Sequence, residues 1–214
     1  MKILNKILDI IYPRNCGVCG HGNKDLCTKC EKKLNKQAVF GVDEYENKFF
    51  IRHYYIFKYE GLIRKLLINY KFNEKPYLYR MFSAFINKYE KDYLHFGFYD
   101  IIIPVPISKK RLKNRGYNQS LLLTKSIAME NNLLLENNVI IKIKNNSTQS
   151  SLNKEEREEN VQGVYKVMDK EKVKNKKILL LDDIYTTGST LDECSKELLQ
   201  VGAKHIDVFT IAKD

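Results

Sequence analysis

The most informative part of this sequence is Lys177-Ile178-Leu179-Leu180-Leu181-Asp182-Asp183-Ile184-Tyr185-Thr186-Thr187-Gly188-Ser189-Thr190-Leu191. Its four apolar residues at 178–181 are typical of a strand that is buried on both faces of a parallel sheet. Two aspartates follow where that strand is expected to end, and a hydroxyl-rich loop then leads into an amphipathic helix at about 190–201. The pattern predicts an α/β fold with a ligand site at the carboxyl ends of parallel strands.

The hydroxyl-rich loop suits a phosphate group. A small glycine-containing loop at a helix start presents free backbone N–H groups and the positive end of the helix dipole. The acids Asp182 and Asp183 could accept hydrogen bonds from a ribose diol or act through Mg²⁺ and its water shell. A 5-phosphorylated ribose would fit both features, with its phosphate in the loop and its hydroxyls on the acids. The alternative is a strand–turn–helix whose Asp and Thr residues only form turns and cap the helix.

This run resembles the signature with which type I phosphoribosyltransferases bind phosphoribosyl pyrophosphate (PRPP). The resemblance implies that Asp182 and Asp183 contact the ribose, both as PRPP ligands and as catalytic residues. It also implies a 5-phosphate loop made of Thr186, Thr187, Gly188, Ser189 and Thr190.

Four of the five cysteines form the spacing C-x2-C-x7-C-x2-C: Cys16, Cys19, Cys27 and Cys30. Each C-x2-C pair can present two thiolates to one ion, and two pairs complete a tetrahedral site. The spacing predicts a structural Zn²⁺ without an open coordination position. Two disulfides are the alternative, although they fit poorly with a chain that shows no export signal.

Length and composition are consistent with one α/β domain and a small appendage. The chain has 214 residues, of which 43% are hydrophobic, enough for a packed core. The net charge of +11 indicates either attraction to polyanions or only a lysine-rich surface. No segment approaches the roughly 18 consecutive apolar residues of a membrane span. The apolar positions of residues 1–12 fall on one helical face, and we expect a docking helix in a cytoplasmic protein.

Residues 38–99 are rich in aromatic residues and lysine. We expect a strand at 54–59 and helices at 60–70 and about 77–89. The aromatic and basic residues could stack single-stranded nucleic acid or pack a small helical subdomain. Beside the signature loop, the region looks like the hood of a phosphoribosyltransferase. Lys71 could then reach the pyrophosphate, or be an ordinary solvated lysine.

The core is expected to begin at Asp100, with a buried strand at 100–103 and a helix at 120–129. Between them lies a cation-rich loop at 109–115, which suits a diphosphate with its Mg²⁺, a nucleic acid or plain solvent. The corresponding loop of type I phosphoribosyltransferases binds pyrophosphate. The resemblance therefore implies that Arg115 and Gly116 bind pyrophosphate here.

A polar segment follows a predicted strand at about 139–144. Residues 145–160 are too many and too charged for a tight connection, so they predict a mobile lid or a surface hairpin. A lid would shield an oxocarbenium-like centre from water. Further strands are expected at 163–167 and 205–211.

Taken together, these motifs resemble the ComF (competence protein F, GntX-like) family over nearly the whole chain. The family often has arginine before the segment that is Thr148-Gln149 here, whereas this chain has Lys142 and Lys144. Lysine keeps the charge but lacks the two-pronged guanidinium with which arginine binds phosphate. The resemblance implies three parts: a leader helix and zinc finger at 1–37, a hood at 38–99 and a type I phosphoribosyltransferase core at 100–214. It also implies a cytoplasmic protein that in some bacteria is tied to DNA uptake during natural transformation.

Two functions fit the sequence. In the first, PRPP and Mg²⁺ bind, pyrophosphate departs and an unidentified nitrogenous base is ribosylated. In the second, the protein is a non-catalytic PRPP sensor or a DNA-uptake accessory protein that binds single-stranded DNA or a competence helicase.

Overall fold

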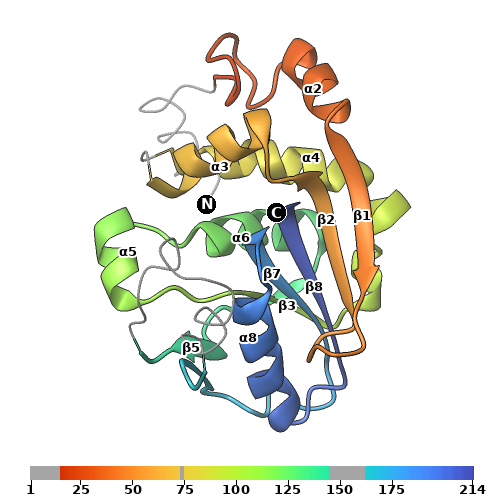
Figure 1. Ribbon diagram of the computed structural model, residues 1–214, viewed down its shortest axis with the longest axis vertical. Coiled ribbons are helices and arrows are strands. Elements are labelled where there is room, and N and C mark those ends of the chain that lie inside the picture. The colour runs from red at the N-terminus through yellow and green to blue at the C-terminus, as the bar shows by residue number, and fades with distance from the viewer. Residues whose placement is uncertain (1–14, 73–74, 145–161) are drawn as a thin grey trace.

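The computed structural model describes residues 15–72, 75–144 and 162–214 (Figure 1). The helix expected at 1–12 and the lid expected at 145–160 lie outside these residues. The described elements are α2 (Thr28–Asn35), β1 (Ala38–Glu44), β2 (Arg52–Lys58), α3 (Gly61–Phe72), α4 (Leu78–Tyr93), the 3-10 helix η1 (Phe96–Phe98), β3 (Ile101–Pro104), α5 (Lys109–Arg115), α6 (Gln119–Asn131), β4 (Leu134–Leu135), β5 (Ile140–Lys142), β6 (Tyr165–Val167), β7 (Lys177–Tyr185), α8 (Ser189–Gln200) and β8 (His205–Lys213).

A six-stranded sheet organises the molecule, in the order β1-β2-β8-β7-β3-β4. All its neighbouring strands are parallel except the pair β1–β2. The signature strand β7 lies inside the sheet, between β3 and β8. The mostly parallel sheet confirms the predicted α/β fold.

Helices cover both faces of this sheet. Side chains alternate between the faces of a strand. Leu179 and Leu181 therefore enter the apolar core that includes α3, α4 and α6, whereas Ile178 and Leu180 enter the core that includes α8. Figure 1 shows α8 in front of the sheet and α6 behind it.

Strand β7 is longer than the sequence suggested. The two aspartates were expected after the strand, but pairing continues through them because β8 extends equally far: Asp182 lies opposite Thr210 and Tyr185 opposite Lys213. The acids are therefore part of the sheet edge and are held by its ladder.

The cation-rich segment at 109–115 is a helix, not the predicted loop. The side chain of Ser108 caps it by accepting a hydrogen bond from the Arg111 backbone N–H at 3.2 Å. The helix ends at Gly116, whose φ of 81° suits glycine. Helix α5 thus fixes the direction of its basic side chains.

Part of the predicted hood belongs to the main sheet. Strand β2 pairs in parallel with β8, and β1 pairs with β2, so the sheet spans the predicted boundary between residues 99 and 100. The three-part division of the chain stays a prediction.

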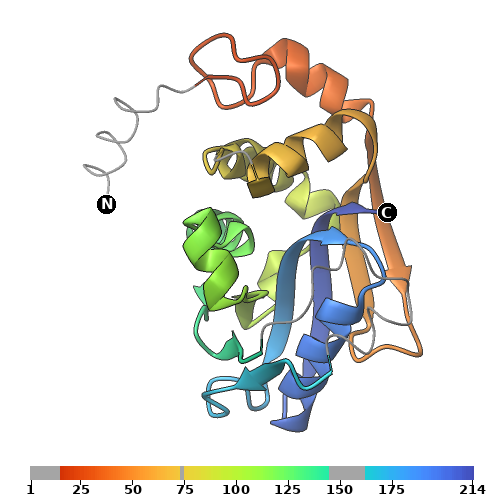
Figure 2. The same ribbon diagram turned by 60° about the vertical axis from the view of Figure 1, so that its left-hand side comes forward.

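The cysteine-containing segment and α2 lie at the end of the molecule next to α3 and α4 (Figure 2). At Gly17, a side chain would overlap Leu78 of α4, so this glycine permits close packing. In the described ranges, no helix has the length and apolar character needed to cross a membrane.

Candidate active site

A cavity of about 760 Å³ opens at the carboxyl ends of β7, β8 and β3. It is the size of a small-molecule site. Its polar lining comprises five basic side chains, three acidic side chains and the hydroxyl-rich loop: Arg64, Lys71, Arg111, Arg115, Lys142, Asp182, Asp183, Asp214, Thr186, Thr187, Ser189 and Thr190. The cavity therefore suits a ligand that carries several negative charges.

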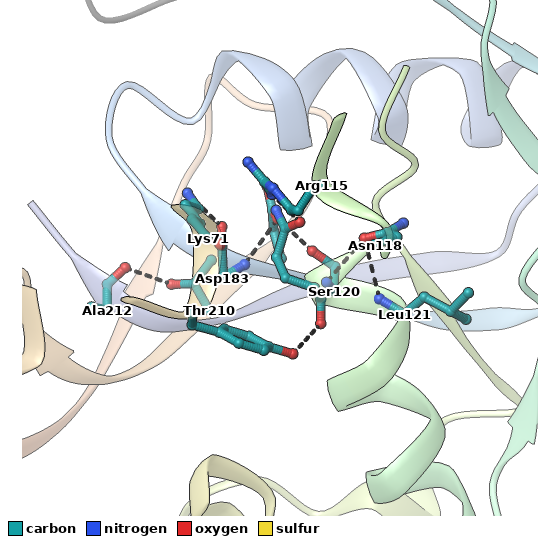
Figure 3. Close-up of polar contacts among 11 residues, drawn as sticks. Lys71, Arg115, Asn118, Ser120, Leu121, Asp183, Thr210 and Ala212 are labelled. Atoms are coloured by element: carbon teal, nitrogen blue, oxygen red, sulfur yellow. Dashed lines mark hydrogen bonds and ion pairs between the residues drawn. The ribbon is translucent and has the colours of Figure 1, made fainter. Parts of the chain in front are cut away.

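The two signature aspartates lie at the base of the cavity. Asp182 Oδ1 accepts hydrogen bonds from the Ser120 hydroxyl at 2.8 Å and from the Asp183 backbone N–H at 2.9 Å. Asp183 is 2% exposed, and its Oδ1 forms an ion pair with Lys71 Nζ at 2.9 Å. Figure 3 shows Lys71 and Asp183 facing each other beside Ser120. The structure thus brings together residues from α3, α6 and β7.

The charges of Asp182 and Asp183 would be stabilised by a cation or by hydrogen-bond donors from a ligand. Burial, together with repulsion from Asp183, raises the pKa of Asp182 to about 7, although Lys71 and the Ser120 hydroxyl act in the opposite direction. Within the described part of the chain, Asp183 Oδ2 is buried without a hydrogen-bond partner. A buried carboxylate oxygen is costly to leave unpaired, so this atom is suited to bind a ligand.

The predicted phosphate loop connects β7 to α8. Gly188 precedes the first residue of α8, has a φ of 77°, and leaves the helix without a side-chain cap. The hydroxyls of Thr187 and Ser189 lie 2.6 Å apart, and Thr186 is exposed. The loop therefore offers hydroxyl groups beside the positive end of a 12-residue helix.

Replacing Gly188 by alanine should damage this loop. An added Cβ would overlap the hydroxyl and ring of Tyr185, and positive φ is unfavourable for alanine. We expect the free energy of unfolding to fall by roughly 1–3 kcal/mol, as measured by denaturant titration. Gly97→Ala is the matched control, because an added Cβ there has open space and no positive φ. Equal stability of the two variants would contradict this prediction.

Arg115 is held at the opposite wall of the cavity. Its guanidinium lies 5.2 Å from the ring centroid of Phe72 and donates a hydrogen bond to Gln119 Oε1. Burial lowers the pKa of Arg115, but a guanidinium stays protonated in proteins. Gly116, the second predicted pyrophosphate ligand, ends α5 and is not among the residues that line the cavity.

The hood helix α3 is fastened to this wall by tyrosines. The Tyr70 hydroxyl donates to the Gln119 carbonyl at 2.6 Å, and the Tyr117 hydroxyl donates to the Tyr70 carbonyl. Since Tyr70 is fully buried, these bonds fix the end of α3, which carries Lys71. The position of Lys71 over the acids follows from that anchoring.

Three cavity cations were not singled out as site residues from the sequence: Arg64, Arg111 and Lys142. Burial and the nearby Arg111 lower the pKa of Lys142 to about 8, so this lysine is mostly charged at neutral pH. Arg111 lies in the cation-rich segment, and the segment's helical form could have been anticipated from Ser108 as its cap. Arg64 gave no sequence signal, because one exposed arginine on a helix looks like a solvated residue.

The four predicted metal ligands form a second candidate site. The sulfur atoms of Cys16, Cys19, Cys27 and Cys30 all lie within 4.8 Å of one another, and none forms a disulfide. The Cys19 and Cys27 sulfurs are 3.9 Å apart, close to the edge of about 3.8 Å in a tetrahedral site with Zn–S bonds of 2.3 Å. The Cys27 backbone N–H also points to the Cys16 sulfur at 3.5 Å. The cluster could hold a metal ion.

Comparison with known proteins agrees with the geometry. The phosphoribosyl transferase domain family matches residues 132–214. Competence protein ComFC of Streptococcus pneumoniae is 31% identical over 209 residues, which cover 95% of this chain and 82% of that protein. Competence protein F of Haemophilus influenzae is 27% identical over 92% of this chain and 84% of its own length. DNA utilization protein YhgH of Salmonella typhi is 29% identical over 53% of this chain and 49% of its own length.

The fold and the domain match define a protein of the phosphoribosyltransferase type. At the level of the whole chain, it belongs to the ComF family of competence proteins. Among solved structures, a purine phosphoribosyltransferase from Pyrococcus horikoshii is a distant likeness, at 15% identity and a TM-score of 0.37 over 63% of this chain and 80% of that one.

Proposed function

We propose that the protein binds PRPP with Mg²⁺ and transfers phosphoribose to a nitrogenous acceptor with release of pyrophosphate. The observation that carries this proposal is the Asp182–Asp183 pair, with its unpartnered buried oxygen, beneath a hydroxyl loop in a cation-lined cavity. Thr186–Thr190 would bind the 5-phosphate, and Arg115 with Lys71 the pyrophosphate. Gly116, which ends α5 beside Arg115, stays a predicted pyrophosphate ligand.

The acids also fit Mg²⁺. Hard cations prefer carboxylate oxygens, and a positive charge would relieve the repulsion that raises the pKa of Asp182. When bound, the ion would neutralise charge on the diphosphate. Asp183 Oδ2 and the outer oxygen of Asp182 are the atoms available for the ion, its water shell or the ribose hydroxyls.

Lys71 has two roles in this proposal. In the free protein it neutralises Asp183 at 2.9 Å. PRPP would offer it pyrophosphate oxygens, and Asp183 would then be released for the ribose diol. Catalysis would come mainly from positioning the substrate and from stabilising the charge on the departing pyrophosphate.

This function is tested first by calorimetric titration with PRPP and Mg²⁺. Pyrophosphate release is then assayed with purine and pyrimidine bases. Binding and base-dependent release are expected. Failure to bind PRPP would exclude the proposal altogether. Binding without pyrophosphate release would support the PRPP site and contradict the transfer reaction.

PRPP binding should release a proton near neutral pH. Because the pKa of Asp182 is raised, this carboxyl is partly protonated in the free protein, whereas the bound state requires the carboxylate. Affinity should therefore weaken as pH falls below 7. At pH 6.5 we expect release of roughly 0.8 proton from Asp182, measured by calorimetry in buffers of different ionisation enthalpy. At pH 8.5, which serves as the control, this release should be close to zero; equal values at both pH values would contradict the assignment.

We propose a structural Zn²⁺ for the four cysteines. The sulfur spacing supports a tetrahedral ion, and a four-thiolate site leaves no position for substrate. Zinc would therefore stabilise the fold rather than take part in the reaction.

A role in DNA uptake is a second proposal. It is favoured by the relatives, which are named competence proteins and DNA utilization proteins. In that role PRPP would act as a sensed ligand, and the partner would be single-stranded DNA or a competence helicase. PRPP binding without pyrophosphate release on any base, together with salt-dependent DNA binding, would favour this role over catalysis.

A further inference from the structure

The cavity extends along the sheet edge in the order of the strands. Ile107 and Arg111 line it beyond β3, the acids line it at β7, and Tyr59 and Asp214 line it beyond β2 and β8. Since the sheet order is β2-β8-β7-β3, the cavity has two ends on opposite sides of the acids.

The two ends have different roles in the proposed reaction. Pyrophosphate would lie toward β3, where Arg115 and its neighbours are held. Displacement at an anomeric carbon brings the nucleophile to the face opposite the leaving group. The acceptor must therefore enter at the other end, beyond β2 and β8.

Beside Asp214, the acceptor end offers an aromatic ring and a guanidinium, which suit a flat molecule with an anionic substituent. Arg64 Cζ lies 6.0 Å from the ring centroid of Tyr59. Among the ion pairs of the described residues, none includes Arg64. The Tyr59 backbone is fixed by its N–H, which donates to the Lys213 carbonyl at 2.7 Å. Ile184 adds a partly buried apolar side chain. An aromatic wall beside an exposed guanidinium is suited to a ring with an anionic substituent.

We propose that the acceptor is a nitrogen heteroaromatic ring carrying a carboxylate, with the ring against Tyr59 and Ile184 and the carboxylate on Arg64. This inference rests on the proposed phosphoribosyl transfer and names the substrate class of that site. It distinguishes the acceptor from an uncharged nucleobase.

The bond changes balance without a further reactant. The lone pair of a ring nitrogen forms the new bond to C1 of the ribose, and the C1–O bond to pyrophosphate breaks with its electron pair leaving on oxygen. A ring N–H, where the acceptor has one, gives its proton to the Asp214 carboxylate. The Asp214 backbone is held by its N–H, which donates to the Tyr185 carbonyl at 2.9 Å.

Binding to the PRPP-loaded protein tests this inference. Pyridine and pyrimidine carboxylates are titrated by calorimetry against the protein with PRPP and Mg²⁺, each beside its carboxamide as the uncharged match. We expect the carboxylates to bind about tenfold more tightly, the effect of one partly exposed charge pair. Arg64→Gln should remove that preference. Lys65→Gln, which changes an exposed neighbour in α3 outside the cavity, should keep it.

The outcomes separate this inference from the function on which it rests. No preference for the carboxylates, or a preference that survives Arg64→Gln, overturns the charged acceptor while PRPP binding stands. Loss of PRPP binding in the unmodified protein contradicts the proposed function itself.

Discussion

Asp182→Asn should abolish binding of PRPP with Mg²⁺ and yet make the free protein more stable. The variant removes a negative charge that the cation and the ribose diol need. We expect affinity to fall by roughly 100-fold or more, equivalent to about 2.7 kcal/mol. Calorimetry with PRPP and Mg²⁺ measures the change.

The gain in stability follows from the raised pKa of Asp182. Between its unfolded pKa of about 4 and its folded pKa of about 7, the native state binds more protons, so the free energy of unfolding falls as pH rises through this range. Above pH 7 the ionised Asp182 costs up to about 4 kcal/mol by this linkage. Asparagine avoids the charge, and its side-chain oxygen can still accept the hydrogen bonds from Ser120 and the Asp183 backbone.

Thermal unfolding at pH 8 should therefore show a melting temperature several degrees higher for Asp182→Asn. Asp92→Asn, the same change at an exposed position of α4, should alter neither stability nor affinity. A destabilised Asp182→Asn variant that binds PRPP normally would mean that Asp182 has a structural role instead.

Removal of the proposed Zn²⁺ should unfold the four-cysteine segment and loosen α4, while β7 stays protected. Structural zinc sites in small finger peptides contribute about 10–16 kcal/mol of apparent binding free energy, so this short segment should depend on its ion. Its contact with α4 is close, because Gly17 packs against Leu78. Hydrogen exchange after chelation should show lost protection at residues 16–35 and weaker protection in α4.

A variant separates metal loss from side effects of the chelator. Cys30→Ser removes a buried cysteine of the cluster and should reproduce the exchange pattern, whereas Lys29→Ser changes an exposed residue of the same helix and should not. Unchanged protection of α4 in Cys30→Ser would show that the segment is stable without its fourth ligand.

Much of the fold could be predicted from the sequence, because strands buried on both faces of a parallel sheet have unbroken runs of apolar residues. Residues 178–181 and 101–103 are such runs, and both are strands of the central sheet. The continuation of β7 through Asp182 could not be read in this way, since it depends on pairing with Thr210 far along the chain. Strand β1 was not anticipated either: a register shift interrupts its pairing between Ala38 and Gly41, and this irregularity leaves no alternating pattern.

In the candidate site, too, some residues could be predicted from local sequence and others could not. Its acids and its loop are contiguous in sequence and could be recognised together as a motif. Arg64 reaches the cavity because β2 pairs with β8 and the chain then continues into α3 at that edge of the sheet. Ser120 contacts Asp182 because α6 packs against β7. Such residues belong to the site through tertiary structure alone.

The placement of β2 also bears on how the chain folds as it is synthesised. One of its two hydrogen-bonded neighbours in the sheet is β8, and the Arg52 backbone N–H donates to the Asp207 carboxylate across 155 residues of sequence. At translation rates of about 5–20 residues per second, β2 therefore waits roughly 8–30 s for the strand that completes its side of the sheet. During this interval β1 and β2 can pack against α3 and α4, but the edge of β2 that faces β8 stays unpaired. Until the ribosome has delivered β8, this unpaired edge is open to pairing with other chains.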